Sequence, residues 1–177
     1  MYKLISDINT LLNEEEVARG SFSVAASTQT SKKLFEKYAH FKEYPTDRDE
    51  NGNPTRDVRY HITISYHPPI SVAKVFQKYL GQKVKVKMSG IYSNEFVQAF
   101  YVKEMTFENG EKLEKRDSGP GKPKGPAHLT LSWERGHKPA EANDLLIQRE
   151  KSNPRPDSGI PDEFTGEFVF IPSKPKA

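Results

Sequence analysis

The order of apolar and polar residues predicts helices that alternate with short strands. Apolar side chains recur at helical spacing in residues 7–17, 30–41, 72–80 and 142–149. Strand-like runs cover residues 21–27, 59–67, 83–88, 96–107, 127–133 and 164–171. Asn109-Gly110 predicts a hairpin turn, whereas residues 45–57 and 117–126 are rich in turn-forming residues and are interpreted as loops. Together these elements predict an α+β fold.

Two of the predicted strands carry the same six-residue pattern. Residues 61–66 are H-I-T-I-S-Y and residues 128–133 are H-L-T-L-S-W, so each reads as His, aliphatic, Thr, aliphatic, Ser, aromatic. The two copies begin 67 residues apart. A single histidine in a strand is usually a bystander, but a repeated His-x-Thr pattern is hard to obtain by chance. The repeat therefore marks the candidate site.

Strand periodicity predicts which side chains of the repeat face one another. Successive side chains of a strand point to opposite faces. His61, Thr63 and Ser65 are accordingly expected on one face, and the second copy is expected to present His128, Thr130 and Ser132 in the same way. The aromatic residues Tyr66 and Trp133 fall on the opposite, aliphatic face, where they are expected to belong to the core.

Two imidazoles and two hydroxyl groups in one site suit phosphoryl transfer without a metal. The imidazole pKa is about 6.5 when unperturbed, so one histidine of a pair can be neutral while the other is protonated. The neutral one takes a proton from an attacking hydroxyl group, and the charged one protonates the departing oxygen. Thr63 and Thr130 each lie two residues after a motif histidine, and their hydroxyl groups can donate hydrogen bonds to the phosphate oxygens.

Composition excludes several other classes of function. The chain of 177 residues contains no cysteine, which removes disulfide scaffolds, thiolate zinc sites and cysteine nucleophiles. A net charge of +3 is too small to predict a coat for duplex nucleic acid. The first residues lack a signal peptide, and no apolar run reaches the length of a membrane span, so a cytoplasmic protein is expected. Residues 47–58 mimic the start of an EF-hand but place Val58 where a glutamate belongs, so neither a metal nor another cofactor is expected.

The paired motifs resemble the 2H phosphoesterase superfamily, whose members share two H-x-T motifs. The resemblance extends to V-A-A at residues 24–26 and G-E-F-V at residues 166–169. It implies a single bilobal domain over residues 1–177 with a central cleft. The first lobe would span about residues 1–82, with an added N-terminal helix, and the second about residues 83–177. It also implies that His61, Thr63, His128 and Thr130 form the catalytic set.

Within the superfamily the chain is most similar to bacteriophage anti-CBASS phosphodiesterases, which degrade the cyclic oligonucleotide signals of bacterial immunity. This resemblance implies metal-independent cleavage of 3′–5′ bonds in a cyclic di- or trinucleotide, in the host cytosol. Two alternatives stay open: a 2′,3′-cyclic phosphodiesterase that acts on RNA ends, and a protein that sequesters the nucleotide without cutting it. Substrate contacts are expected from Lys122, Lys124, Trp133 and Glu167. Trp133 is included because a bend at the end of its strand would turn it toward the cleft, and the lysines lie in a loop that is either a solvated segment or a lid.

Overall fold

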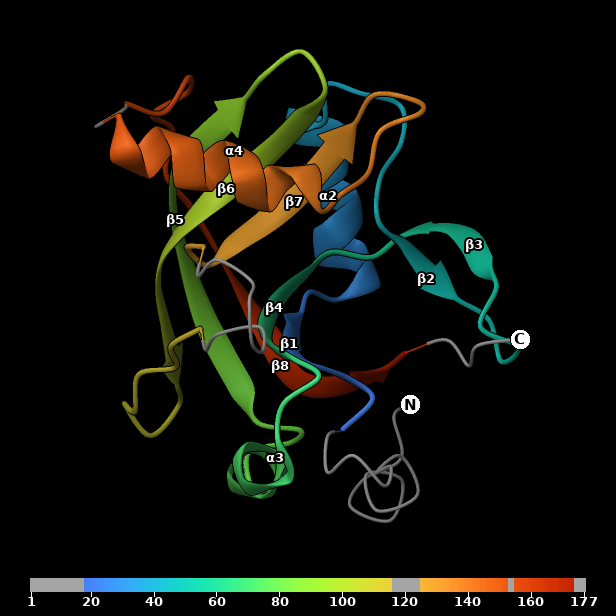
Figure 1. Cartoon of the computed structure of the whole chain (residues 1–177), viewed down its shortest axis with the longest axis vertical. Coiled ribbons are helices and arrows are strands. Elements are labelled where there is room, and N and C mark those ends of the chain that lie inside the picture. The colour runs from blue at the N-terminus through green and yellow to red at the C-terminus, as the bar shows by residue number, and fades with distance from the viewer. Residues whose placement is uncertain (1–17, 116–124, 153–154, 174–177) are drawn as a thin grey trace.

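A computed structural model describes residues 18–115, 125–152 and 155–173. Three helices and eight strands lie in this part of the chain, in agreement with the predicted α+β class (Figure 1). The helices are α2 (Thr28–Tyr38), α3 (Ile70–Gln77) and α4 (Glu141–Lys151). The strands are β1 (Gly20–Ala25), β2 (Thr46–Arg48), β3 (Pro54–Val58), β4 (His61–Tyr66), β5 (Lys83–Ser93), β6 (Val97–Phe107), β7 (His128–Trp133) and β8 (Asp162–Pro172). The helix expected over residues 7–17 lies outside the described residues.

Six strands form one antiparallel sheet in the order β4-β1-β8-β5-β6-β7. The two motif strands, β4 and β7, are its two edge strands. The sheet curls so strongly that these edges meet, and the buried hydroxyl group of Tyr60, just before β4, donates to the carbonyl of Leu131 in β7 at 2.9 Å. The fold thus brings two motifs that are distant in sequence to the same place.

The C-terminal strand β8 lies at the middle of the sheet, between β1 and β5. It places the V-A-A segment of residues 24–26 beside the G-E-F-V segment of residues 166–169, because Val24 pairs with Phe168 and Ala25 with Glu167. Gly166 is required here: a Cβ at this position would lie 2.7 Å from the Val24 side chain and 2.8 Å from the Ala25 carbonyl oxygen. That approach is closer than real Cβ contacts allow. The assignment of residues 1–82 and 83–177 to two lobes stays a prediction.

A large hydrophobic core fills the inside of the curled sheet. Phe22, Phe168 and Phe170 pack ring against ring from β1 and β8, and Phe76 of α3 joins them. A second, smaller cluster lies on the other face of the sheet, where α4 packs Leu145 and Leu146 against β6. Helix α2 is capped by Ser27, whose hydroxyl group accepts a hydrogen bond from the backbone N–H of Thr30.

The expected loop at residues 45–57 contains regular structure. Strands β2 and β3 pair there as a separate two-stranded hairpin. Its turn is closed by the Asp49 carboxylate, which accepts the backbone N–H groups of Asn51 and Asn53, and by Gly52 with a φ of 78°. The prediction failed because hairpin strands of three and five residues carry too few apolar positions to show a period. The turn at Asn109-Gly110 is confirmed, with the Phe107 N–H bonded to the Glu111 carbonyl.

No helix in the described ranges is both long and apolar enough to cross a lipid bilayer.

Candidate active site

Both motif histidines lie on the face of the sheet that points away from the large core. Ile62 and Leu129, the residues that follow them, belong to that core and are fully buried. The period-2 rule therefore turns His61 and His128 to the opposite face, where both are half-buried. Thr63 and Thr130, the two motif threonines, are half-buried on the same face. This arrangement agrees with the expected placement of the four residues, whose catalytic roles stay a prediction.

The two motif strands share an irregularity that sequence periodicity does not reveal. In β4, Ser65 pairs with Phe22 and Thr63 with Ser23, which leaves Ile64 as an extra residue. In β7, Ser132 pairs with Gln98 and Thr130 with Ala99, which leaves the equivalent residue Leu131 unpaired. Each strand thus has a β-bulge at the fourth position of the motif. A bulge shifts the alternation of side chains beyond it by one residue.

The bulges place the last two residues of each motif on faces opposite to those expected. The predictions that Ser65 and Ser132 face the histidines, and that Tyr66 faces the core, are wrong. For Trp133 the structure follows the alternative of an irregularity near the end of its strand, which turns the residue to the histidine face. Ser65 and Ser132 are buried, and the Ser132 hydroxyl group donates to the Gln98 side chain at 3.0 Å. Tyr66 instead pairs with Ser21 on the histidine face and is 40% exposed.

Trp133 also lies on the histidine face, but α4 limits its access. It pairs with Val97 and packs against the small cluster under that helix. Its backbone exchanges hydrogen bonds with Glu43, at 2.9 and 3.3 Å. Glu167, in β8, is exposed and lies two strands from His61 in the same row of the sheet, because Ala25 pairs with both. Lys122 and Lys124 lie outside the described residues, so contacts from all four residues stay predictions.

The orientation of the His128 ring is fixed by its backbone. Its Nδ1 lies 2.9 Å from the carbonyl oxygen of Pro126, and a carbonyl can only accept, so Nδ1 carries the hydrogen. In the neutral ring the lone pair is then on Nε2, which is free to act as a base. Burial lowers the pKa of His128 to about 4, and the charges of Lys115 and His61 act in the same direction.

His61 has a matching environment in the other motif. Burial lowers its pKa, a hydrogen bond with the backbone of Arg59 opposes that change, and the charges of Arg59 and Arg48 add to the lowering. Each imidazole ring thus forms a hydrogen bond with the backbone of the residue two positions before it and has a cationic side chain nearby. In the free protein we therefore expect both imidazoles to be neutral at neutral pH. The acid of the pair would gain its proton when an anion enters and offsets the nearby positive charges.

We expect His128 to make the protein less stable in mild acid. Its folded pKa is below its unfolded value of about 6.5, so the unfolded chain takes up a proton first as pH falls. The stability is complete above about pH 6.5 and is lost toward about pH 4, and a shift of this size corresponds to roughly 3 kcal/mol. Urea unfolding at about pH 7 and about pH 4 should show this loss in the native protein and a smaller one in His128→Gln. An exposed control, His40→Gln, should behave like the native protein, and an equal loss in all three would contradict the assignment.

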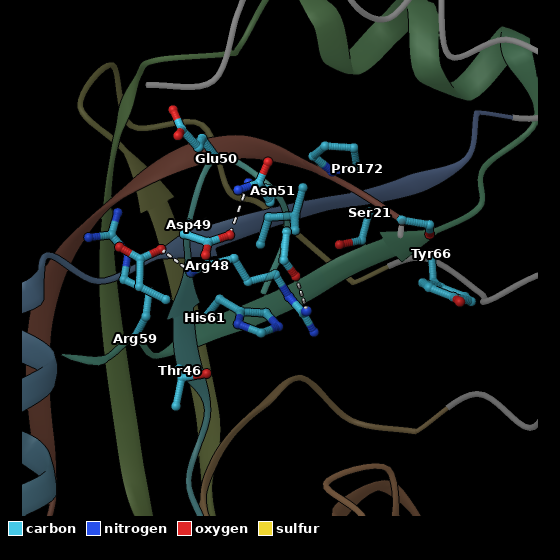
Figure 2. A pocket seen from close by; sticks show the side chains of 14 residues that line it. Ser21, Thr46, Arg48, Asp49, Glu50, Asn51, Arg59, His61, Tyr66 and Pro172 are labelled. Atoms are coloured by element: carbon cyan, nitrogen blue, oxygen red, sulfur yellow. Dashed lines mark hydrogen bonds between the residues drawn. The ribbon is translucent and has the colours of Figure 1, made fainter. Parts of the chain in front are cut away.

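A pocket of about 630 Å³ opens beside His61 (Figure 2). Its walls are β2 and the turn that follows it, the two ends of β4, the start of β1 and the end of β8. Arg48 and Arg59 line it, as does Tyr66, whereas His128 and the motif threonines do not. Sequence analysis missed both arginines, although Arg59 stands only two residues before His61. Arg48 had no comparable signal, because its approach depends on the hairpin.

A further cation lies beside His128. Lys115, which precedes the predicted loop, is half-buried, and its Nζ lies 3.4 Å from the Asn143 side-chain oxygen. Lys112, three residues earlier, forms an ion pair with Glu104 at 3.8 Å instead. Within the described ranges, no three His, Asp or Glu side chains gather in a way that could hold a metal ion.

Comparison with known proteins leaves the function to be inferred from these residues. No protein-family model matches the chain, and no curated protein matches its sequence. Among solved structures, the crystal structure of a fungal RNA kinase is similar with a TM-score of 0.43 and 11% sequence identity. The match covers 87% of this chain and 44% of that chain, so this chain spans less than half of that protein's length.

Proposed function

We propose that the chain is a phosphodiesterase of the 2H type, in which His61 and His128 are the acid–base pair. One observation supports this most: the curled sheet joins its two edges where both H-x-T motifs lie. A fold that served only to bind a nucleotide would not need two imidazoles with matched backbone partners and matched cations. The same correspondence between the motif strands favours a bilobal arrangement with related halves.

The proposed reaction is attack by a ribose 2′-hydroxyl group on the neighbouring 3′–5′ phosphodiester. The neutral histidine takes the 2′-proton, the 2′-oxygen bonds to phosphorus, and the bond to the 5′-oxygen breaks. The protonated histidine donates its proton to that 5′-oxygen. The product is a 2′,3′-cyclic phosphate, which water opens to a 3′-phosphate in a reversal of the two histidine roles. Thr63 and Thr130 would donate to the non-bridging oxygens as negative charge gathers on them.

Cyclic di- and trinucleotides are the proposed substrates. Their phosphates are anions that complement Arg48, Arg59 and Lys115, which are distributed around the two histidines. The resemblance noted in the sequence extends this proposal to the cyclic oligonucleotides that signal in bacterial antiphage defence. On that proposal the protein would remove the signal in the cytosol of the infected cell, through contacts that also include Lys122, Lys124, Trp133 and Glu167.

Cleavage is expected to proceed in the presence of a chelator, because the imidazoles supply both proton transfers. The purified protein would be incubated with cyclic di- and trinucleotides in EDTA, and the products separated by chromatography. We expect linear products that end in a 3′-phosphate or a 2′,3′-cyclic phosphate. Activity that disappears in EDTA and returns with a divalent ion would contradict metal independence. Tight binding without any product would favour the sequestering alternative.

A further inference from the structure

The pocket beside His61 contains two cations, Arg48 and Arg59, that have no acidic partner among the described residues. No ion pair joins Arg48 or Arg59 to a carboxylate in the part of the chain that the structure describes, although three acidic residues line the same pocket. Two of these carboxylates are bound to the hairpin backbone: Asp47 accepts from the N–H of Arg48, and Asp49 accepts from the turn. Glu50 is exposed at the tip.

Arg59 is held near His61 with part of its hydrogen-bonding capacity unused. Its Nη1 donates to the Thr28 hydroxyl group at 3.2 Å. Its Nε is buried and has no hydrogen-bond partner among the described residues. A buried guanidinium N–H without a partner is costly, and a phosphate oxygen is an acceptor that guanidinium groups bind well. Arg48 approaches the same region from the hairpin, where its Nη1 donates to the Gly52 carbonyl at 2.7 Å.

An aromatic ring lies at the opposite end of the pocket. Along the chain Arg59 precedes His61, and Tyr66 ends the same strand, so the arginine and the tyrosine lie on either side of the histidine (Figure 2). The Tyr66 ring stacks on His67 with a centroid separation of 4.0 Å and an angle of 14°. The His67 ring is held in turn by Ser173, with Nε2 2.8 Å from its hydroxyl oxygen. The result is a supported aromatic surface that is 40% exposed.

Size agrees with an occupant larger than a phosphate. Tyr66 is five residue steps from His61, which corresponds to roughly 16 Å along an extended strand; the bulge at Ile64 and the long side chains shorten this separation. A volume of about 630 Å³ lies within the range of pockets that hold small organic ligands. Cations beside His61 and a stacking surface at the end of its strand match the phosphate and the base of a nucleotide.

We propose that this pocket, defined by Arg48, Arg59, Tyr66 and the β2–β3 hairpin, binds one nucleotide of the substrate next to the phosphate that is cleaved. The nucleotide phosphate lies against the two arginines, and its base stacks on Tyr66. This inference rests on the proposed function, since it assigns one half of a dinucleotide to the side of His61. It makes Arg59 and Tyr66 binding residues rather than catalytic ones.

Calorimetric titration with three probes tests the proposal: 5′-AMP, adenosine and inorganic phosphate. In the native protein, 5′-AMP is expected to bind more tightly than either part alone. Arg59→Gln should weaken 5′-AMP and phosphate about tenfold and leave adenosine unchanged, whereas Tyr66→Ala should weaken 5′-AMP and adenosine about tenfold and leave phosphate unchanged. Tyr66→Phe keeps the ring and should restore binding. Arg48→Gln, on the exposed hairpin, repeats the phosphate test should Arg59→Gln fold poorly.

Two matched controls lie outside the pocket. Phe96 is also 40% exposed and stacks on a histidine, His137, at 4.1 Å and 13°, so Phe96→Ala removes an equivalent ring. The control for Arg59→Gln is Arg56→Gln, because Arg56 is an exposed arginine of β3. Both controls should bind all probes normally.

Unchanged 5′-AMP binding in all pocket variants, or its loss in His128→Gln alone, would overturn the inference. If the protein cleaves cyclic dinucleotides but the pocket variants bind 5′-AMP normally, this inference is wrong and the proposed function still holds. If the pocket variants lose 5′-AMP binding but the native protein does not cleave cyclic dinucleotides, the nucleotide site holds and the proposed function is wrong.

Discussion

Replacement of either motif histidine, as His61→Ala or His128→Ala, is expected to lower the turnover of a cyclic dinucleotide by about 10²- to 10⁴-fold. Each change removes a group that transfers a proton in the transition state, while KM should change much less because the phosphate contacts of the arginines and threonines are kept. Steady-state rates measured in EDTA would show this split. Neither ring belongs to the large core, so both variants should retain the native circular dichroism spectrum.

The controls for this experiment are the other histidines of the described chain that carry no proposed role. His40 is exposed, and the Nδ1 of His137 is hydrogen-bonded to Glu141 at 3.0 Å, so His40→Ala and His137→Ala should turn over substrate at the native rate. His61→Gln and His128→Gln keep a polar side chain of similar size and separate chemistry from packing. A variant of either motif that works at near-native rates while folded would refute the paired mechanism.

Substrate analogues without a free 2′-hydroxyl group are expected to bind but not to be cleaved. A 2′-deoxy or 2′-O-methyl cyclic dinucleotide keeps the charge and the leaving group but lacks the internal nucleophile, whose position about 3 Å from phosphorus the ribose itself provides. Rates should fall by several orders of magnitude, since effective molarities of internal nucleophiles reach about 10⁵ M or more. Product analysis measures cleavage, and competition against the ordinary substrate measures binding.

Efficient cleavage of the 2′-deoxy analogue would instead mean that water attacks phosphorus directly. The histidine pair would survive such a result, but the internal-nucleophile mechanism would not. With the ordinary substrate, the pH profile should be bell-shaped, because one imidazole must be neutral and the other charged. Since both pKa values are lowered in the free protein, the acid limb of kcat/KM should lie below the usual histidine range.

The short-range pattern was enough to predict the two strands that carry the H-x-T motifs. The alternation in H-I-T-I-S-Y and H-L-T-L-S-W predicted two strands, and His61, Thr63, His128 and Thr130 lie on the face opposite the core as expected. This worked because the side-chain period of a strand is a local property, which buried aliphatic neighbours at every second position fix without reference to the rest of the chain.

The hydrophobic pattern gave wrong predictions where pairing with a neighbouring strand determines which face a side chain is on. Unbroken alternation predicts Tyr66 and Trp133 in the core, with a bend at the end of the strand as the alternative for Trp133, yet bulges at Ile64 and Leu131 reverse the alternation in both strands. A bulge exists only relative to a neighbouring strand, here β1 or β6, so no count along one strand can find it. The burial of Ser65 and Ser132 has the same cause.

Long-range closure determined the rest of the candidate site. The repeat by itself showed that two similar strands exist, whereas the curl of the sheet, with Tyr60 bonded to Leu131, brought its edges together. The pocket next to His61 likewise depends on a hairpin too short to have a hydrophobic period, which brings Arg48 near a strand that follows it in the chain. Sequence thus determined which residues face away from the core, and tertiary structure decided which of them meet, because contacts between distant segments depend on how the whole sheet bends.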